Sequence, residues 1–306
     1  MRVRDVAFNR TQQFDILVAT CGYERRSSYL ARLGVAAARK LAVVYPGTVG
    51  LSFASNRAIY EAEAWDQVAE RELLDELARE LHGAVHVSLC IDVSSMARRT
   101  IANMVELVSE HPNVGVVQFV YCPARYETSA RAAAVVRPLS AGPITPYFSG
   151  TLRSPSIPIG LIVGLGLEPH RADGLIELLE PSRLWSFVAS SEDERFATDV
   201  LSMHSSLLGG TRSVPVSYDV HSLSDIYSSL DSLVFSAGLR YRLLIAPSGP
   251  KIFGLAALLV GANRSDSRPA IWRVGVEGAI DAPIDVLEAG DVVSAVVTLS
   301  DHIDDA

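Results

Sequence analysis

Short apolar runs alternate along the N-terminal half of the chain with segments whose apolar residues recur at helical spacing. The runs predict strands over residues 15–20, 40–45, 85–91 and 114–121. The segments between them predict helices over residues 27–39, 65–81 and 101–108. Continuous apolar strands that alternate with amphipathic helices are typical of a parallel sheet covered by helices on both faces.

The C-terminal half carries a similar pattern. Strands are predicted over residues 160–165, 184–189, 241–246 and 270–274, and helices over residues 223–234 and 251–260. Either Ser222 or Ser224 can cap the first of these helices. Residues 291–299 also have strand character but match no segment of the N-terminal half. Residues 137–156 are rich in proline, glycine and serine, which predicts a linker.

The two halves are similar in sequence as well as in pattern. LVATCGYER, from Leu17, matches LIVGLGLEP, from Leu161, at an offset of 144 residues, and the same offset lays LAVVY over WSFVA. Ser94 pairs with Ser248 when the offset grows by ten, and VVQFV then lies over AIWRV. We therefore predict an α/β protein of two tandem Rossmann-like units, each a mostly parallel sheet covered by helices on both faces. The predicted boundaries are residues 1–136 for unit 1, 137–156 for the linker, and 157–306 for unit 2 with a C-terminal extension.

Composition and charge narrow the class of protein. Hydrophobic residues make up 49% of the chain and charged residues 20%, a balance typical of globular proteins. A net charge of −8 disfavours broad electrostatic binding to duplex nucleic acid. The longest apolar runs fall short of the roughly 20 residues that span a bilayer. The N-terminus lacks the apolar segment of a secretory signal, so we expect a cytoplasmic protein without a membrane partner.

Cysteines and histidines show no metal-binding pattern. Cys21, Cys90 and Cys122 lie in or beside apolar runs without CxxC spacing, which predicts buried, reduced thiols. His82 and His86 stand four residues apart, but a glycine and an incoming strand separate them. We therefore expect no metal site.

Two sets of polar residues follow predicted strands, where ligands bind in parallel sheets. The first set contains Glu24 and Arg25, matched in the second half by Glu168. Glutamate at the head of a helix can bind hydroxyls or cap amides. Its presence in both halves points to a ligand, but a purely structural helix-start acid remains an equal alternative.

The second set lies after the third predicted strand of each half. It consists of Asp92, Ser94, Ser95 and Arg98 in unit 1, and Ser248, Gly249 and Lys251 in unit 2. Short hydroxyl and glycine residues before a helix expose amides that can hold phosphate beside a cation. Lys251 is one of only two lysines among 27 basic residues. Ordinary serine capping and a solvated basic turn are the alternative, since no GxxxxGK[ST] loop and no GxSxG turn occurs.

The tandem arrangement, with DVSSMARR and PSGPK at strand-to-helix junctions, resembles the CRISPR-associated Rossmann fold (CARF) and its fused relative, the SAVED domain. The resemblance implies binding of a cyclic oligonucleotide made in bacterial antiphage signalling. It also implies a separate effector protein as partner, because no nuclease, protease or membrane effector sequence is attached.

These observations lead to one leading hypothesis and two alternatives. The leading hypothesis is a nucleotide-sensing module that binds a phosphate-containing ligand between its two halves. Residues 94–98 and 248–251 would hold the phosphates, and Glu24 and Glu168 would contact ribose or base. The first alternative is an enzyme acting on a nucleotide or sugar phosphate, with Glu24 or Asp92 as general base. The second is a scaffold subunit of a protein complex. No catalytic residue and no cofactor is assigned.

Overall fold

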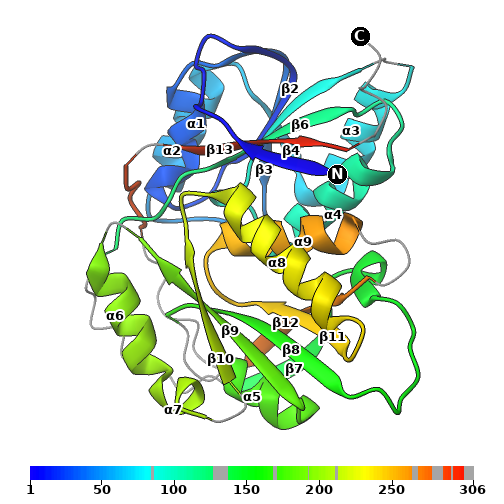
Figure 1. Ribbon diagram of the computed structural model, residues 1–306. Coiled ribbons are helices and arrows are strands. Elements are labelled where there is room, and N and C mark those ends of the chain that lie inside the picture. Colours follow the sequence, from blue (N-terminus) through cyan, green and yellow to red (C-terminus); the bar gives the residue numbers. More distant parts are fainter. Residues whose placement is uncertain are drawn as a thin grey trace. The chain divides into compact units, whose positions relative to one another are not determined.

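The computed structural model contains two compact α/β units (Figure 1). Unit 1 comprises Met1–Arg125 and Pro283–Ala306, and unit 2 comprises Tyr126–Ala282. The structure describes residues 1–83, 86–126, 137–167, 171–191, 193–210, 213–263, 268–277, 285–290 and 292–299.

Unit 1 is built on a seven-stranded sheet. Its strands are β1 (Arg2–Asp5), β2 (Gln13–Thr20), β3 (Ala36–Val44), β4 (Asp66–Ala69), β5 (Ser88–Asp92), β6 (Val116–Tyr121) and β13 (Val293–Thr298). They lie in the order β1-β13-β6-β5-β2-β3-β4. The five strands from β6 to β4 run parallel, and β13 pairs antiparallel with both β6 and β1. In Figure 1 the red β13 lies beside the dark blue β1, which shows that the two ends of the chain share this sheet.

Helices connect the parallel strands of unit 1. They are η1 (Arg25–Ser28), α1 (Tyr29–Arg32), α2 (Phe53–Ala62), η2 (Glu70–Glu72), α3 (Leu73–Leu81) and α4 (Arg98–Glu110). Leu73, Leu77 and Leu81 recur every four residues, so they share one face of α3 and are fully buried. Helix α4 buries Ile101 and Met104 in the same way.

Unit 2 has a six-stranded sheet. Its strands are β7 (Arg137–Pro143), β8 (Ile159–Leu165), β9 (Arg183–Ser190), β10 (Ser213–Asp219), β11 (Arg242–Pro247) and β12 (Ala270–Glu277), in the order β10-β9-β8-β11-β12-β7. Its helices are η3 (Pro146–Ser149), α5 (Arg171–Leu179), α6 (Glu194–Met203), α7 (Ser205–Leu208), α8 (Leu223–Ala237) and α9 (Lys251–Asn263). The Ser222 hydroxyl caps α8 by accepting from the Asp225 amide at 3.1 Å, so Ser222 is the capping serine. Helix α9 is apolar all round and is buried from Ile252 to Gly261.

Both sheets have the same strand order. The first parallel strand, β2 or β8, is central; the next two lie on one side of it and the fourth and fifth on the other. This is the Rossmann order, in which the chain reverses direction across the sheet between the first and fourth strands. An antiparallel strand then lies beside the fifth strand in each unit. The prediction of two Rossmann-like units with mostly parallel sheets is confirmed.

The unit boundaries differ from the predicted ones. Strand β7 lies in the segment predicted as a linker, residues 137–156, and pairs with β12 of unit 2. Strand β13 lies in the predicted extension of unit 2 but pairs with β1 and β6 of unit 1. Strand β7 thus follows β6, the fifth parallel strand of unit 1, but joins the sheet of unit 2. Strand β13 follows β12, the fifth parallel strand of unit 2, but joins the sheet of unit 1. Hydrophobic periodicity identified β13 as a strand but could not identify its partners, whereas the proline, glycine and serine content of residues 137–156 concealed β7 altogether.

Several elements also depart from the prediction. The helix expected over residues 27–39 ends at Arg32, because Gly34 adopts a left-handed conformation (φ +65°) and the chain from Ala36 joins β3. The third strand of each unit, β4 and β10, was not predicted. Strand β4 is only four residues long, and the predicted helix over residues 65–81 begins at Leu73 instead.

None of the helices in the described part of the chain is long and apolar enough to span a bilayer.

The three cysteines are buried and unpaired, as predicted. Burial raises the pKa of Cys21 to about 11 and that of Cys122 to about 12, and it also raises the pKa of Cys90. Because the thiolate is the reactive form, we expect the folded protein to resist iodoacetamide at pH 8, whereas the unfolded chain reacts at all three positions. Mass spectrometry of the alkylated chain measures both states. Rapid modification of the folded protein at Cys21 would contradict this prediction.

Candidate functional site

The carboxyl ends of β2 and β5 lie side by side in unit 1, because the two strands pair directly. The loop that follows β2 turns toward η1, and the loop that follows β5 turns toward α4. The strand order reverses between these two strands, and ligands of doubly wound sheets bind at this reversal point. The unit 1 members of both predicted polar sets therefore lie at the same edge of the sheet.

The loop after β2 is fixed by buried hydrogen bonds. The Ser27 hydroxyl accepts from the Gly22 amide at 2.7 Å and donates to the Thr20 carbonyl. The Asn56 side chain, on α2, donates to the carbonyls of Gly22 and Glu24 at 2.9 and 2.8 Å. This loop is held in one conformation by groups from β2, η1 and α2.

Glu24 is partly buried and forms an ion pair with Arg26. The Arg26 Nε donates to Glu24 Oε2 at 2.8 Å, and Nη1 donates to the Cys122 carbonyl at 2.9 Å. The Ser95 hydroxyl also donates to Glu24 Oε2, at 3.0 Å. Arg26 is only 6% exposed. Burial alone would lower the pKa of Arg26, but the Glu24 carboxylate and Tyr121 raise it above its ordinary value. The pair thus joins the loops that follow β2, β5 and β6.

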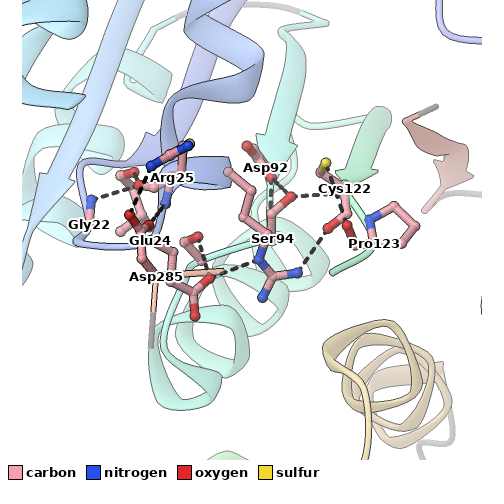
Figure 2. A network of polar contacts seen from close by, with 12 residues as sticks. Gly22, Glu24, Arg25, Asp92, Ser94, Cys122, Pro123 and Asp285 are labelled. Atoms are coloured by element: carbon pink, nitrogen blue, oxygen red, sulfur yellow. Dashed lines mark hydrogen bonds and ion pairs between the residues drawn. The ribbon is translucent and has the colours of Figure 1, made fainter. Parts of the chain in front are cut away.

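Asp92 and Ser94 form a second buried pair at the end of β5. Asp92 Oδ1 accepts from both the amide, at 2.8 Å, and the hydroxyl of Ser94, and the Ser94 hydroxyl accepts from the Cys122 amide at 2.7 Å. Figure 2 shows the two groups at this edge, with Glu24 near Asp285 in one and Asp92, Ser94 and Cys122 in the other. The contacts of Asp92 and Ser94 hold the β5 loop against β6.

The remaining predicted residues of unit 1 have different surroundings. The Arg25 side chain is 57% exposed, while its amide donates to Asp285 Oδ1 at 2.7 Å. Arg98 is the first residue of α4. The amide of the preceding residue, Ala97, donates to the Tyr45 hydroxyl at 2.8 Å. The Ser95 hydroxyl reaches the Glu24 carboxylate from the β5 loop.

In unit 2, Ser248 and Gly249 form the turn between β11 and α9, and Lys251 is the first residue of α9. A Cβ at Gly249 would lie 2.6 Å from the Leu165 carbonyl oxygen, so this turn touches the end of β8. The turn therefore lies at the reversal point of the second sheet, the position that the β5 loop occupies in unit 1. The predicted counterpart of Glu24, Glu168, lies outside the described residues.

Sequence reasoning missed two side chains of this edge, Asn56 and Asp285. Asn56 fixes the β2 loop from a helix more than thirty residues away, and Asp285 reaches it across 260 residues. No periodicity or local motif marks either residue, since each acts through a long-range contact. Within the residues that the structure describes, no group of three or more His, Cys, Asp or Glu side chains could hold a metal ion.

Comparison with known proteins gives no family. No protein-family model matches the chain, and no curated protein matches it. Among solved structures, the chain is similar to a ketoreductase from the first module of phoslactomycin biosynthesis in Streptomyces sp. HK803, at 15% identity over 85% of this chain and 68% of that one. The TM-score of 0.23 is too low to support a conclusion about fold or function.

Proposed function

We propose that this chain is a nucleotide-sensing module that binds the phosphate groups of its ligand at the carboxyl edges of its sheets. The observation that carries the proposal is the recurrence of polar turns at the reversal point of both Rossmann-ordered sheets. The resemblance to CARF and SAVED domains suggests a cyclic oligonucleotide of antiphage signalling as ligand and a separate effector protein as partner.

The proposed phosphate contacts differ between the units. In unit 2, the amides of the turn at Ser248 and Gly249 and the cation of Lys251 would contact phosphate oxygens. The start of α9 suits this role, because the helix is 13 residues long and is packed in the core. In unit 1, Ser95 and Arg98 at the start of α4 would do the same.

Glu24 and Asp92 have positioning roles in this proposal. Glu24 already accepts from Arg26 and Ser95, and Asp92 accepts twice from Ser94. Donors of this kind make a carboxylate less basic and occupy lone pairs that a general base would direct at its substrate. This arrangement favours a binding module over the enzymatic alternative.

The function is tested by calorimetric titration with a panel of cyclic and linear nucleotides. We expect Lys251→Ala to weaken binding by roughly 10- to 100-fold, because a charge-assisted hydrogen bond to phosphate contributes about 1.5–3 kcal/mol. Lys40→Ala is the matched control, since Lys40 lies within β3 and donates to the Glu63 carbonyl. We expect that variant to bind as the wild type does.

Two outcomes would contradict the proposal. One is the absence of binding by every nucleotide in the panel, and the other is equal affinity of the Lys251→Ala and Lys40→Ala variants. Mass spectrometry of the ligands after incubation separates sensing from catalysis. Unchanged nucleotides support a sensor, whereas conversion to products would establish the enzymatic alternative.

A further inference from the structure

Residues 285–290 of unit 1, here called the strap, lead into β13 and contact the carboxyl edge of the sheet. At one end of the strap, the Arg26 amide donates to the Val286 carbonyl at 3.1 Å. At the other end, the Ala289 amide donates to the Pro123 carbonyl at 2.9 Å, just beyond β6. Since β5 lies between β2 and β6, the strap spans the end of β5 and the reversal point of the sheet.

The first residue of the strap, Asp285, accepts two hydrogen bonds and forms one ion pair through its carboxylate. Oδ1 accepts from the Arg25 amide at 2.7 Å, and Oδ2 accepts from the Ser52 hydroxyl at 2.7 Å. The Arg25 guanidinium lies 3.6 Å from Oδ2. Glu24 and Arg25 follow β2, and Figure 2 shows Asp285 directly beside them.

An amide, a hydroxyl and a guanidinium are the donors with which proteins hold carboxylate and phosphate oxygens. The donors come from two separate segments, since Ser52 immediately precedes α2 and Arg25 is the first residue of η1. Asn56, four residues beyond Ser52, fixes that loop through the Glu24 carbonyl. The β2 loop that precedes Arg25 is thus held by Asn56 independently of the Asp285 carboxylate.

The rest of the strap is held less completely. One carboxylate oxygen of Glu288, Oε1, pairs with Arg32 at 3.0 Å. The other, Oε2, is shielded from water and has no hydrogen-bond partner among the residues described. A shielded carboxylate oxygen without a donor costs free energy. This cost is relieved when the strap moves away from the sheet edge.

We propose that the Arg25 amide, the Arg25 guanidinium and the Ser52 hydroxyl form an oxyanion subsite, and that Asp285 occupies it as an internal competitor. A phosphate group of the ligand exchanges with the carboxylate and releases the strap. The ligand class rests on the function proposed above. Release of the strap changes the surface at this edge of the sheet, and a separate effector protein would bind that changed surface.

The test is a titration of inorganic phosphate into the full chain, followed by NMR at the Arg25 amide. We expect Asp285→Ala to bind phosphate about tenfold more tightly than the wild type, since the variant no longer fills its own subsite. Asp66→Ala is the matched control: it removes the same charge at the start of β4, where Asp66 pairs with Arg39. We expect that control to bind as the wild type does.

A second pair of variants guards against misfolding. Asp285→Asn keeps the shape of the side chain and should give a smaller increase in affinity. Adding Ser52→Ala to Asp285→Ala should abolish the gain, because one donor of the subsite is lost. Hydrogen exchange at the Arg26 and Ala289 amides should accelerate when phosphate binds. The Arg26 amide donates to the strap carbonyl of Val286, and the Ala289 amide belongs to the strap and donates to Pro123, so both bonds break when the strap is released.

The outcomes separate this inference from the proposed function. Equal phosphate affinity of Asp285→Ala and Asp66→Ala, or an Arg25 amide that does not respond, overturns the subsite even if nucleotides bind through Lys251. Conversely, if no nucleotide binds the wild type but phosphate binds Asp285→Ala at Arg25, the subsite stands and the nucleotide-sensing function fails.

Discussion

A chain that ends after Gly290 is expected to lose the folded state of unit 1. Strand β13 is an interior strand of the sheet, paired with β6 on one side and with β1 on the other. Val293, Ala295 and Val297 are buried. Removing two buried valines alone costs about 3–6 kcal/mol. The ladder bonds of two strand pairs are lost as well, against a typical domain stability of about 5–15 kcal/mol.

The matched control is a chain that ends after Leu299, which keeps all of β13. Soluble yield, limited proteolysis and the fluorescence of Trp65, buried in unit 1, compare the two chains. In the shorter chain we expect an exposed Trp65 and rapid cleavage within residues 1–125. Residues 137–277 should be retained as a fragment in both, because unit 2 takes its own antiparallel strand from β7.

A second experiment tests whether restoring β13 is enough for unit 1 to fold. The Arg125 amide donates to the Leu287 carbonyl, so residue 125 ends close to the strap. A linker of about six residues can therefore join residues 1–125 to residues 285–299. We expect this shortened chain, which contains unit 1 without unit 2, to fold, whereas residues 1–125 alone should not. Native Trp65 fluorescence in a chain that stops at Gly290 would show that β13 is dispensable.

Much of the fold could be predicted because most of its parallel strands are continuous apolar runs. Strands β2, β5, β8 and β11 match predicted strands closely, and the similarity between the halves indicated a common order. The prediction failed where the local pattern is weak. Residues 66–69 read DQVA and carry little apolar signal, yet they form β4 by pairing with β3. Residues 36–38 are all alanine, good helix formers that pairing with β2 draws into β3.

The site could be predicted only as far as its local loops. Glycine, serine and charged residues after strands identified the loops at Glu24, Ser94 and Ser248, because those residue types need no distant partner to be recognised. The role of Glu24 could not be read in this way. Its partner Arg26 looks like part of a solvated basic turn next to Arg25, and only the folded chain shows that Arg26 is buried while Arg25 is exposed.

Arg26→Met is expected to destabilise unit 1 by at most about 3–5 kcal/mol, since it removes the buried partner of a partly buried ion pair. The Glu24 carboxylate would keep the Ser95 hydroxyl as a donor but lose the positive charge of Arg26, and the Cys122 carbonyl would lose its bond from Arg26. Arg25→Met is the matched control, because it changes the same residue type at the neighbouring, exposed position. We expect that control to cost less than about 1 kcal/mol.

A double-mutant cycle distinguishes a paired role from simple packing. If the cost arises from an uncompensated charge, adding Glu24→Gln to Arg26→Met should recover part of the lost stability, so that the double variant unfolds later than the sum of the single effects predicts. Urea unfolding followed by Trp65 fluorescence, with Trp185 and Trp272 replaced by phenylalanine, restricts the signal to unit 1. Additive effects would instead mean that Arg26 acts through its contact with Cys122, and that Glu24 is not held in place by its charge.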